Sequence, residues 1–399
     1  MSALSAAYLR HSLSERVGEF ITLRREIHAH PELAFQEHRT AALVARKLTD
    51  WGYQVATGLG GTGVVGTLRR GQGPRRLGLR ADMDALPITE ATGHAWASQT
   101  AGVMHACGHD GHTATLLAAA RQVAEHGDFD GTLHLIFQPA EEGAAGAVRM
   151  MDDGLFERFP CDAIFALHNM PGTPTGHFTF RAGAAMASSD NVTIVLQGVG
   201  GHGAMPHTTA DPLVAASSLV MALQTVVSRN VDPLHTAVVT VGALQAGQAN
   251  NVIPDQATLK LSVRALDPAV RSLLKQRIHE LVTQQAASFR VRADIDWQDG
   301  YAVLINDSAC TTLATELATR LFGAERVTPN GAPITASEDF AFMLQRVPGC
   351  YFFVGNGAAG TPGACMVHNP GYDFNDDIIA DGAAFWGALV HEYLTPAQG

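Results

Sequence analysis

Residues 105–112, HACGHDGH, combine side chains that divalent metal ions take as ligands. Cys107 and His109 lie two positions apart, and Gly108 between them permits the backbone bend that would turn both side chains toward one ion. Thiolate, neutral imidazole and carboxylate are the usual ligand groups. The pattern predicts a metal site. The alternative is a thiolate nucleophile at Cys107 with His109 as its base. This alternative gives no role to the glutamates and the distant histidines described in the following paragraphs.

Three other residues of this octapeptide are less specific. Asp110 stands directly before a predicted helix, where an aspartate caps the helix more often than it binds metal. His105 and His112 lie close to the Cys-His pair, and we assign neither of them a role.

Two adjacent glutamates follow a strongly apolar stretch. QPAEEG (138–143) places Glu141 and Glu142 between Pro139 and Gly143, just after residues 131–137, which are typical of a buried strand. Neighbouring side chains point in different directions, so one carboxylate can bind metal while the other serves as a general base. A pair of solvated surface charges is the alternative.

Two histidines occur in similar wording, 200 residues apart. His168 stands in ALHNMP at the end of a predicted buried strand, and His368 stands in MVHNPGYDFND, a loop rich in proline and glycine. A single histidine in such a place is often structural. Because the HNxP-like pattern occurs twice, each copy supports the other as a ligand segment.

The elements that would position these residues alternate between strand and helix. Residues 63–68, 76–82, 131–137 and 162–168 are expected strands, and 113–125 and 144–151 are expected helices. This alternation favours an α/β fold with a mostly parallel sheet covered by helices on both faces. In such sheets the functional groups gather beyond the carboxyl ends of the strands, where Asp84, the glutamate pair and His168 all fall.

The chain is long enough for two domains, because single cores usually stop growing at about 300 residues. Its 399 residues change pattern near 185, where alternating strands and two amphipathic helices begin. We expect an inserted α+β sandwich at 185–298. The segments 1–184 and 299–399 would form the metal-binding catalytic domain.

Composition narrows the classes of partner. There are 27 basic and 38 acidic residues, giving a net charge of −11, so nucleic acid is not an expected partner. Apolar stretches fall short of the about 18 residues of a membrane span. The five cysteines form no CxxC pair, and the first twenty residues lack a basic leader and are typical of the run-in to an amphipathic helix. We expect a cytoplasmic protein without membrane partners.

A family resemblance rests on motifs that occur in order over nearly the whole chain. The motifs are LRADMDALP (79–87), HACGHDGHTATLL (105–117), FQPAEEGAAGA (137–147), LHNMP (167–171), GGHGAMPH (200–207), NVIP (251–254), SEDF (337–340) and VHNPGYDFND (367–376). These segments resemble the dinuclear metallo-amidohydrolases of the aminoacylase and carboxypeptidase family, in the branch of hippurate hydrolase and the indoleacetyl-amino-acid hydrolases.

The resemblance implies a zinc-peptidase-like catalytic domain with two divalent metal ions per subunit. Zinc or manganese would be the metals, with cobalt or nickel as further options. The inserted domain would be a lid and dimerisation domain, which implies a homodimer or higher homo-oligomer. The implied metal ligands are Cys107, in place of an aspartate bridge in related peptidases, with His109, Glu142, His168 and His368.

Further residues receive catalytic and substrate-binding roles from the same resemblance. Glu141 would be the catalytic base, and Asp84 would orient a ligand histidine. His202 and Asn251 would reach the scissile amide from the lid, the histidine often from the partner subunit of a dimer. Arg264 would pair with a substrate carboxylate, although LKLSVR (259–264) lacks the Gly-Thr that the family often has before this arginine.

The implied reaction is the hydrolysis of N-acyl amino acids, including hippurate-like conjugates, to a carboxylic acid and a free amino acid. A divalent ion would lower the pKa of a bound water to about 7, and Glu141 would take its proton. Peptide hydrolysis of the dipeptidase or carboxypeptidase type at the same site is an alternative. A Cys107 thiolate hydrolase and a non-catalytic metal-carrying protein are further alternatives.

Overall fold

The computed structural model describes residues 16–395, so most of the expected run-in at the N-terminus lies outside the described residues. The chain divides into two compact units. The first contains the residues up to Gly183, Asn306–Ala332 and the residues from Phe342 onward, and the second contains Ala184–Ile305 and Pro333–Ala341.

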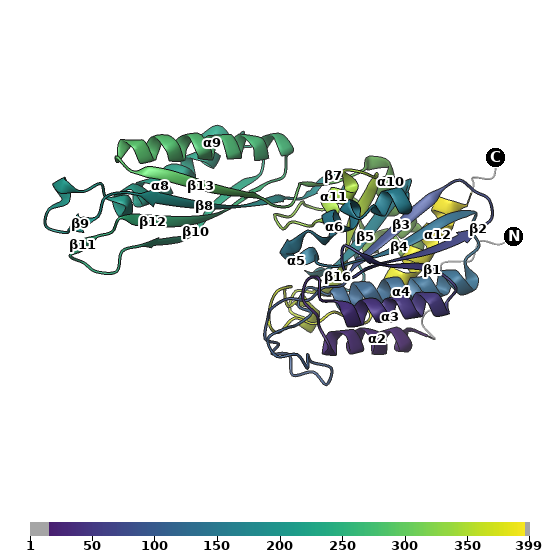
Figure 1. The fold of residues 1–399 in the computed structure, drawn as a ribbon. Helices are drawn as coiled ribbons and strands as arrows, with labels where there is room; N and C mark the ends of the chain where they lie inside the picture. Colours follow the sequence, from purple (N-terminus) through teal and green to yellow (C-terminus); the bar gives the residue numbers. More distant parts are fainter. Residues whose placement is uncertain (1–15, 396–399) are drawn as a thin grey trace. The chain divides into compact units, whose positions relative to one another are not determined.

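An eight-stranded sheet forms the centre of the first unit (Figure 1). In order across the sheet its strands are β1 (Gln54–Leu59), β2 (Gly63–Arg70), β4 (Gly131–Gln138), β3 (Arg76–Asp82), β5 (Ala163–Gly172), β16 (Gly349–Ala358), β6 (Phe178–Thr179) and β15 (Val327–Thr328). The central strands β4, β3, β5 and β16 are parallel to one another. The outer strands β1 and β2 pair antiparallel. The predicted α/β class with a mostly parallel sheet is confirmed.

Helices cover both faces of this sheet. A side chain at Gly66 would meet Leu48 of α3 (His38–Asp50), whereas one at Gly63 would meet Met150 of α6 (Gly146–Asp152). These two positions of β2 are an odd number of residues apart, so they face opposite sides of the pleat. The other helices are α2 (Val17–Ala29), α4 (His109–His126), α5 (Glu141–Ala144), α7 (Leu155–Arg158), α10 (Ser308–Phe322), α11 (Phe340–Leu344) and α12 (Ile378–Leu394).

The second unit is an α+β sandwich. Its antiparallel sheet has the order β10 (Ala237–Ala246), β12 (Gln256–Ala265), β8 (Ser188–Gln197) and β13 (Arg292–Asp299). Two helices pack against this sheet, α8 (Pro212–Asn230) and α9 (Pro268–Ser288). Burial alternates along β12 with a period of two, because one face of the strand meets the helices. Two two-stranded sheets complete the description of the strands. One pairs β9 (Gly201–His202) with β11 (Val252–Ile253), and the other pairs β7 (Gly183–Met186) with β14 (Leu304–Asn306).

The second unit includes two segments that the sequence pattern places in the catalytic domain. It extends to Ile305, beyond the expected end at 298, and it takes in Pro333–Ala341. Backbone hydrogen bonds explain the second segment, because the amide of Ala187 donates to the carbonyls of Ile334 (3.1 Å) and Ala336 (2.9 Å). The lid and dimerisation roles of residues 185–298 stay predictions.

Among the described residues, one helix passes a length-and-composition test for a membrane span. It is α8, with a mean hydropathy of 1.3 and 33% of its residues buried. Helices of soluble cores pass the same test, and the buried side of α8 lies in the apolar core of the second unit.

Candidate metal centre

Helix α4 brings the Cys-His pair to the carboxyl end of the central strands. Gly108 has a left-handed backbone (φ 95°), so the helix begins at His109, four residues earlier than predicted. A side chain at Gly108 would collide with Asn169 and Tyr372. The expectation that Asp110 caps the helix is wrong, because Gly108 occupies the cap position and Asp110 lies inside the first turn.

Two groups of potential ligands share one thiol. Cys107, His109 and His168 form the first group, and Cys107, Glu142 and His368 form the second; within each group the ligand atoms lie within 4.8 Å of one another. The structure therefore brings together all five predicted ligands, which come from four separate segments of the chain. A thiolate at the shared position can contact two ions, which is what a dinuclear centre requires.

Asp84 fixes the orientation of His109. Its Oδ1 lies 3.2 Å from Nδ1 of His109, and its two oxygens accept the backbone N–H groups of Glu141 (3.0 Å) and Glu142 (2.9 Å). With Nδ1 engaged, the buried Nε2 of His109 has no hydrogen-bond partner among residues 16–395. Histidine ligands of metals commonly have this arrangement, in which one ring nitrogen has no hydrogen bond and the other is held by a carboxylate. The predicted position of Asp84 beside a ligand histidine agrees with this geometry.

Replacement of Asp84 by asparagine is expected to lower metal affinity about 10-fold to 100-fold, because His109 loses its charged orienting partner. Competition with a chromophoric chelator measures this change. Asp162→Asn is the control, since it removes a carboxylate that pairs with Arg76 away from the candidate ligands. An equal loss of affinity in both variants would contradict the orienting role.

His168 is oriented in a similar way. Its Nδ1 lies 2.7 Å from the carbonyl oxygen of Asn169, and its Nε2 lies 3.4 Å from Sγ of Cys107. The first contact places the proton on Nδ1 and leaves the Nε2 lone pair facing the thiol. His168 lies within β5 and not at its end, because pairing with β16 continues to Gly172.

The glutamate pair follows a strained residue. Ala140 has a left-handed backbone (φ 54°), and its N–H donates to Oε1 of the buried Glu37 (2.9 Å). Such a conformation in a residue with a side chain persists only where the surroundings hold it. Glu141 is buried and Glu142 is half-buried, and the side chain of Glu142 lies 3.1 Å from Nε2 of His368. The supporting role of Glu37 was not predicted, because a glutamate before a helix is an unremarkable residue.

The charges around Cys107 fit a divalent cation. Burial, the nearby Glu142 and Glu141 carboxylates and Asp82 all raise the pKa of the Cys107 thiol. A positive ion between these groups would offset their mutual repulsion and favour the thiolate. The bare nitrogen of His109 and the mixture of sulfur, nitrogen and oxygen donors support the same fit.

His112 is a supporting residue. Its Nδ1 lies 2.6 Å from Asp82 and its Nε2 lies 2.8 Å from Oδ1 of Asn169, so neither nitrogen is left for an ion. Asp82 also accepts from Arg80 (2.7 Å). His105 is buried without a hydrogen-bond partner for either ring nitrogen among the described residues, and burial lowers its pKa to about 4.

His202 and Asn251 lie side by side in the second unit. His202 in β9 pairs with Val252 of β11, and the amide of Gly203 donates to the carbonyl of Asn251 (2.8 Å). Both side chains are exposed, and Nδ1 of His202 accepts from the amide of Ala204 (3.0 Å). In the neutral ring the proton is then on Nε2.

Arg264 has partners within its own unit. Its Nη1 donates to the carbonyl oxygen of Thr335 (3.0 Å) and lies 3.5 Å from the hydroxyl of Ser337. These contacts fasten the segment Pro333–Ala341 to β12. The predicted pairing of Arg264 with a substrate carboxylate stays a prediction.

Comparison with known proteins places this geometry in a family. A model of the peptidase family M20/M25/M40 matches residues 78–392, which include the five candidate ligands. The chain belongs to this family. The predicted family resemblance is confirmed.

Known proteins resemble the chain along most of its length. Hippurate hydrolase of Campylobacter jejuni is 45% identical over 377 residues, which are 94% of this chain and 97% of that protein. N-acetyl-L-cysteine deacetylase of Bacillus subtilis is 39% identical over 94% of this chain and 88% of its own. A Bacillus subtilis structure described as a dinuclear metal-binding M20 peptidase superposes with a TM-score of 0.81 at 31% identity, covering 95% and 98% of the two chains.

A buried histidine beside the metal centre predicts a pH-dependent stability. His28 lies 2.8 Å from Asp110 and 3.3 Å from Glu90. Burial opposes its charge, but Asp110 and Glu90 outweigh burial and raise its pKa to about 9. Because the pKa is higher in the folded state, charged His28 adds to the free energy of unfolding. This contribution is fully present at pH values below the unfolded pKa of about 6.5, and it is lost as the pH rises through about 9.

The expected result is that His28→Gln destabilises the protein more at pH 6 than at pH 9.5, by on the order of 3 kcal/mol for a shift of this size. Urea unfolding of the two proteins at both pH values measures the difference. Taking the difference between the wild type and His28→Gln cancels the pH dependence of stability that both proteins share. A difference that is the same at both pH values would contradict a charged His28.

Proposed function

We propose that this protein is a metal-dependent amidohydrolase that cleaves N-acyl amino acids to a carboxylic acid and a free amino acid. The observation that carries the proposal is the pair of ligand groups that share Cys107, with the Glu141 carboxylate beside them. Relatives named for hippurate hydrolysis and for N-acetylcysteine deacetylation support this substrate class.

The proposed ligands are Cys107, His109, Glu142, His168 and His368. A divalent ion held there supplies Lewis-acid polarisation of the amide carbonyl and makes water more acidic. Cys107 would be shared between two ions. Zinc and manganese both accept these donors, and cobalt or nickel can occupy the same set, since metal availability often decides.

Glu141 is the proposed general base. It takes a proton from the attacking water and delivers it to the leaving nitrogen, so one carboxylate serves both proton transfers. Its backbone amide is fixed by Asp84, which also orients His109. This shared anchor supports a fixed position of the base relative to the ligand histidine.

His202 and Asn251 are the proposed donors to the substrate from the second unit. The Nε2–H of a neutral His202 is suited to stabilise the negative oxygen of the tetrahedral intermediate, an interaction worth about 3 kcal/mol in known oxyanion sites. The side-chain amide of Asn251, which is also exposed, can donate to the same region. Arg264 would pair with the substrate carboxylate. Its side chain is only half-buried, so part of it is open to a ligand.

Two other activities differ in testable ways. A peptidase would use the same metal centre with a dipeptide in place of an acyl amino acid. A thiolate hydrolase would need His109 to serve Cys107, and it would leave Glu142, His168 and His368 without a role although all three form ligand groups with Cys107. A non-catalytic metal carrier has no use for a buried carboxylate at position 141.

The test is the release of free amine from N-acetyl, N-benzoyl and longer N-acyl amino acids and from dipeptides. The protein is assayed after chelation and again after Zn²⁺, Mn²⁺ or Co²⁺ is restored. Activity on acyl amino acids that disappears with chelation and returns with metal supports the proposal. Activity confined to dipeptides supports the peptidase, and activity that iodoacetamide abolishes but chelation does not supports the thiolate mechanism.

We also propose a homodimer formed through the second unit, in a reducing cytoplasm. Exposed apolar side chains of α8, among them Val214 (49% exposed) and Met221 (71%), support an interface there. Met221→Glu is expected to convert the dimer to a monomer, as measured by sedimentation velocity, because it places a charge among apolar contacts. A variant that stays dimeric would exclude this face. The five free cysteines suit a reducing compartment.

A further inference from the structure

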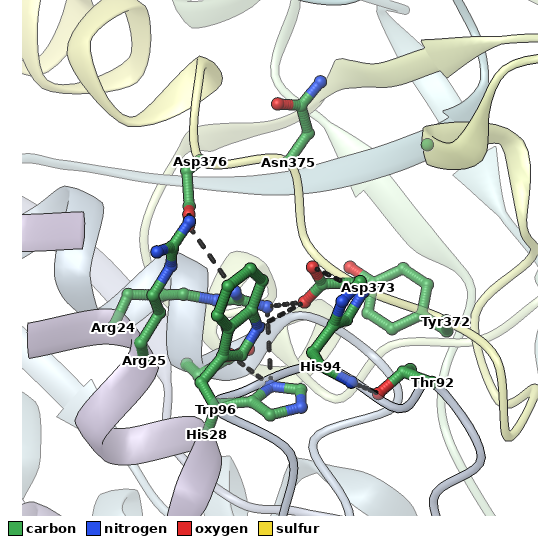
Figure 2. A network of polar contacts seen from close by, with 12 residues as sticks. Arg24, Arg25, His28, Thr92, His94, Trp96, Tyr372, Asp373, Asn375 and Asp376 are labelled. Atoms are coloured by element: carbon green, nitrogen blue, oxygen red, sulfur yellow. Dashed lines mark hydrogen bonds and ion pairs between the residues drawn. The ribbon is translucent and has the colours of Figure 1, made fainter. Parts of the chain in front are cut away.

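Arg24 of α2 joins two regions of the first unit through buried ion pairs. Its side chain is completely buried. Its Nε lies 2.8 Å from Oδ2 of Asp110, its Nη2 pairs with Asp373, and its Nη1 lies 3.5 Å from Asp376. Figure 2 shows Arg24 and Arg25 extending from α2 toward the loop that holds Asp373 and Asp376. A buried guanidinium requires such partners, because an uncompensated charge in the interior is costly.

Two partners of Arg24 lie on the same segments of the chain as candidate ligands. Asp110 directly follows His109 in the first turn of α4, and Asp373 lies five residues after His368 in the C-terminal loop. One guanidinium therefore holds the segment of one ligand against the segment of the other. These ligands are 259 positions apart in the sequence, and none of the strands in the described part of the chain pairs one segment with the other.

The C-terminal loop needs an external constraint. His368 has a left-handed backbone (φ 65°), which is unfavourable for a residue with a side chain. Its amide donates to the carbonyl of Ala106 (2.7 Å), and Tyr372 accepts a hydrogen bond from Asn169 (2.6 Å). These bonds fix the two ends of the segment 368–372, and the ion pair at Asp373 fixes the residue that follows.

We propose that Arg24 is a positioning residue for the ion on the His368 side of the metal centre. By holding Asp110 and Asp373 together, it sets the separation of Cys107 and His368, the two ligands of this ion that lie on the joined segments. The ion on the His168 side depends less on Arg24, because Asp84 orients His109 and the carbonyl of Asn169 orients His168. The inference rests on the proposed metal centre and adds Arg24, which has no hydrogen bond or ion pair to a candidate ligand among residues 16–395.

The neighbouring Arg25 offers a matched control. It pairs with Asp376 (2.8 Å) and its guanidinium lies over the ring of Trp96 (3.7 Å from the centroid), so it fastens the same loop. Its side chain is 39% exposed, and its partners do not include Asp110. Replacement of Arg25 therefore removes a basic residue that contacts the loop, but it leaves the ion pair between Arg24 and Asp110 of α4 in place.

The experiment is a titration of the chelated full-length protein with Co²⁺, followed by the visible absorption of the bound ion. The wild type is compared with Arg24→Lys, which keeps the charge and loses the fork geometry, and with Arg25→Gln. Asp373→Asn is a second test variant, because it opens the link at a partly exposed residue and leaves Arg24 paired with Asp110. Near-ultraviolet circular dichroism identifies the variants that fold.

The expected result is two Co²⁺ per wild-type chain and a loss of about 10-fold to 100-fold in the affinity for one of them in Arg24→Lys and Asp373→Asn. The other ion keeps its affinity within threefold, and Arg25→Gln keeps both. Unchanged affinities in both test variants, or equal losses in Arg25→Gln, would overturn the positioning role. A wild type that binds no Co²⁺ would refute the metal centre itself, which separates the two failures.

Discussion

Replacement of Glu141 by glutamine is expected to lower kcat for the hydrolysis of N-acyl amino acids by about 10²-fold to 10⁴-fold, the range for loss of a general base. Glutamine has a similar shape but cannot take a proton at neutral pH. The backbone amide that Asp84 holds is unaffected, so the local structure should stay in place. KM should change little. Steady-state kinetics with a benzoyl or acetyl amino acid measures the effect.

Metal analysis of the same variant separates the base from the ligands. Glu141→Gln should retain its metal, whereas Glu142→Gln should lose metal and activity together, because Glu142 belongs to the group with Cys107 and His368. The two glutamates are neighbours, so each variant is the matched control for the other. Full activity of Glu141→Gln would refute the proposed mechanism.

Replacement of Cys107 by alanine is expected to remove most of the metal and nearly all activity. The thiol belongs to both ligand groups, so its loss weakens two ions at once. Apparent binding free energies of structural zinc sites are about 10–16 kcal/mol, and a shared ligand contributes a large part of the total. Inductively coupled plasma mass spectrometry gives the metal per chain, and the acyl amino acid assay gives the activity.

Cys161→Ala is the control for this experiment. Cys161 is also a free thiol, but it lies beside Phe159, and its thiol donates to that residue's carbonyl. This variant should keep both metal and activity. If Cys107→Ala lost activity with its metal content unchanged, the thiolate mechanism would replace the proposed one.

Much of the catalytic unit could be predicted because its signals are local. The apolar run before Glu141 is a central strand, and the loop between Cys107 and His109 bends at a glycine, as expected from residue type. The grouping of ligands could be anticipated only in part. Strand order explains why the ends of β3, β4 and β5 are neighbours, but His368 reaches them through a loop without regular structure.

The parts that could not be predicted depend on contacts between distant segments. Asp110 looks like a helix cap in the sequence, but the positive φ of Gly108 moves the helix start and leaves Asp110 facing Arg24. The segment Pro333–Ala341 looks like part of the catalytic domain, but its backbone bonds join it to the second unit. Local periodicity carries no information about either contact.

The three hydrogen bonds of Asp84 have an evolutionary consequence. One carboxylate orients His109 and also fixes the backbone of the glutamate pair, so under the proposed function a substitution there alters metal affinity and proton transfer together. Selection cannot adjust these two properties separately at position 84. His202 and Asn251, the proposed donors to the substrate, belong to a different unit of the chain, so substitutions there leave the hydrogen bonds of Asp84 unchanged. The division into two units therefore allows the proposed substrate contacts to vary while the bonds around Asp84 stay constant.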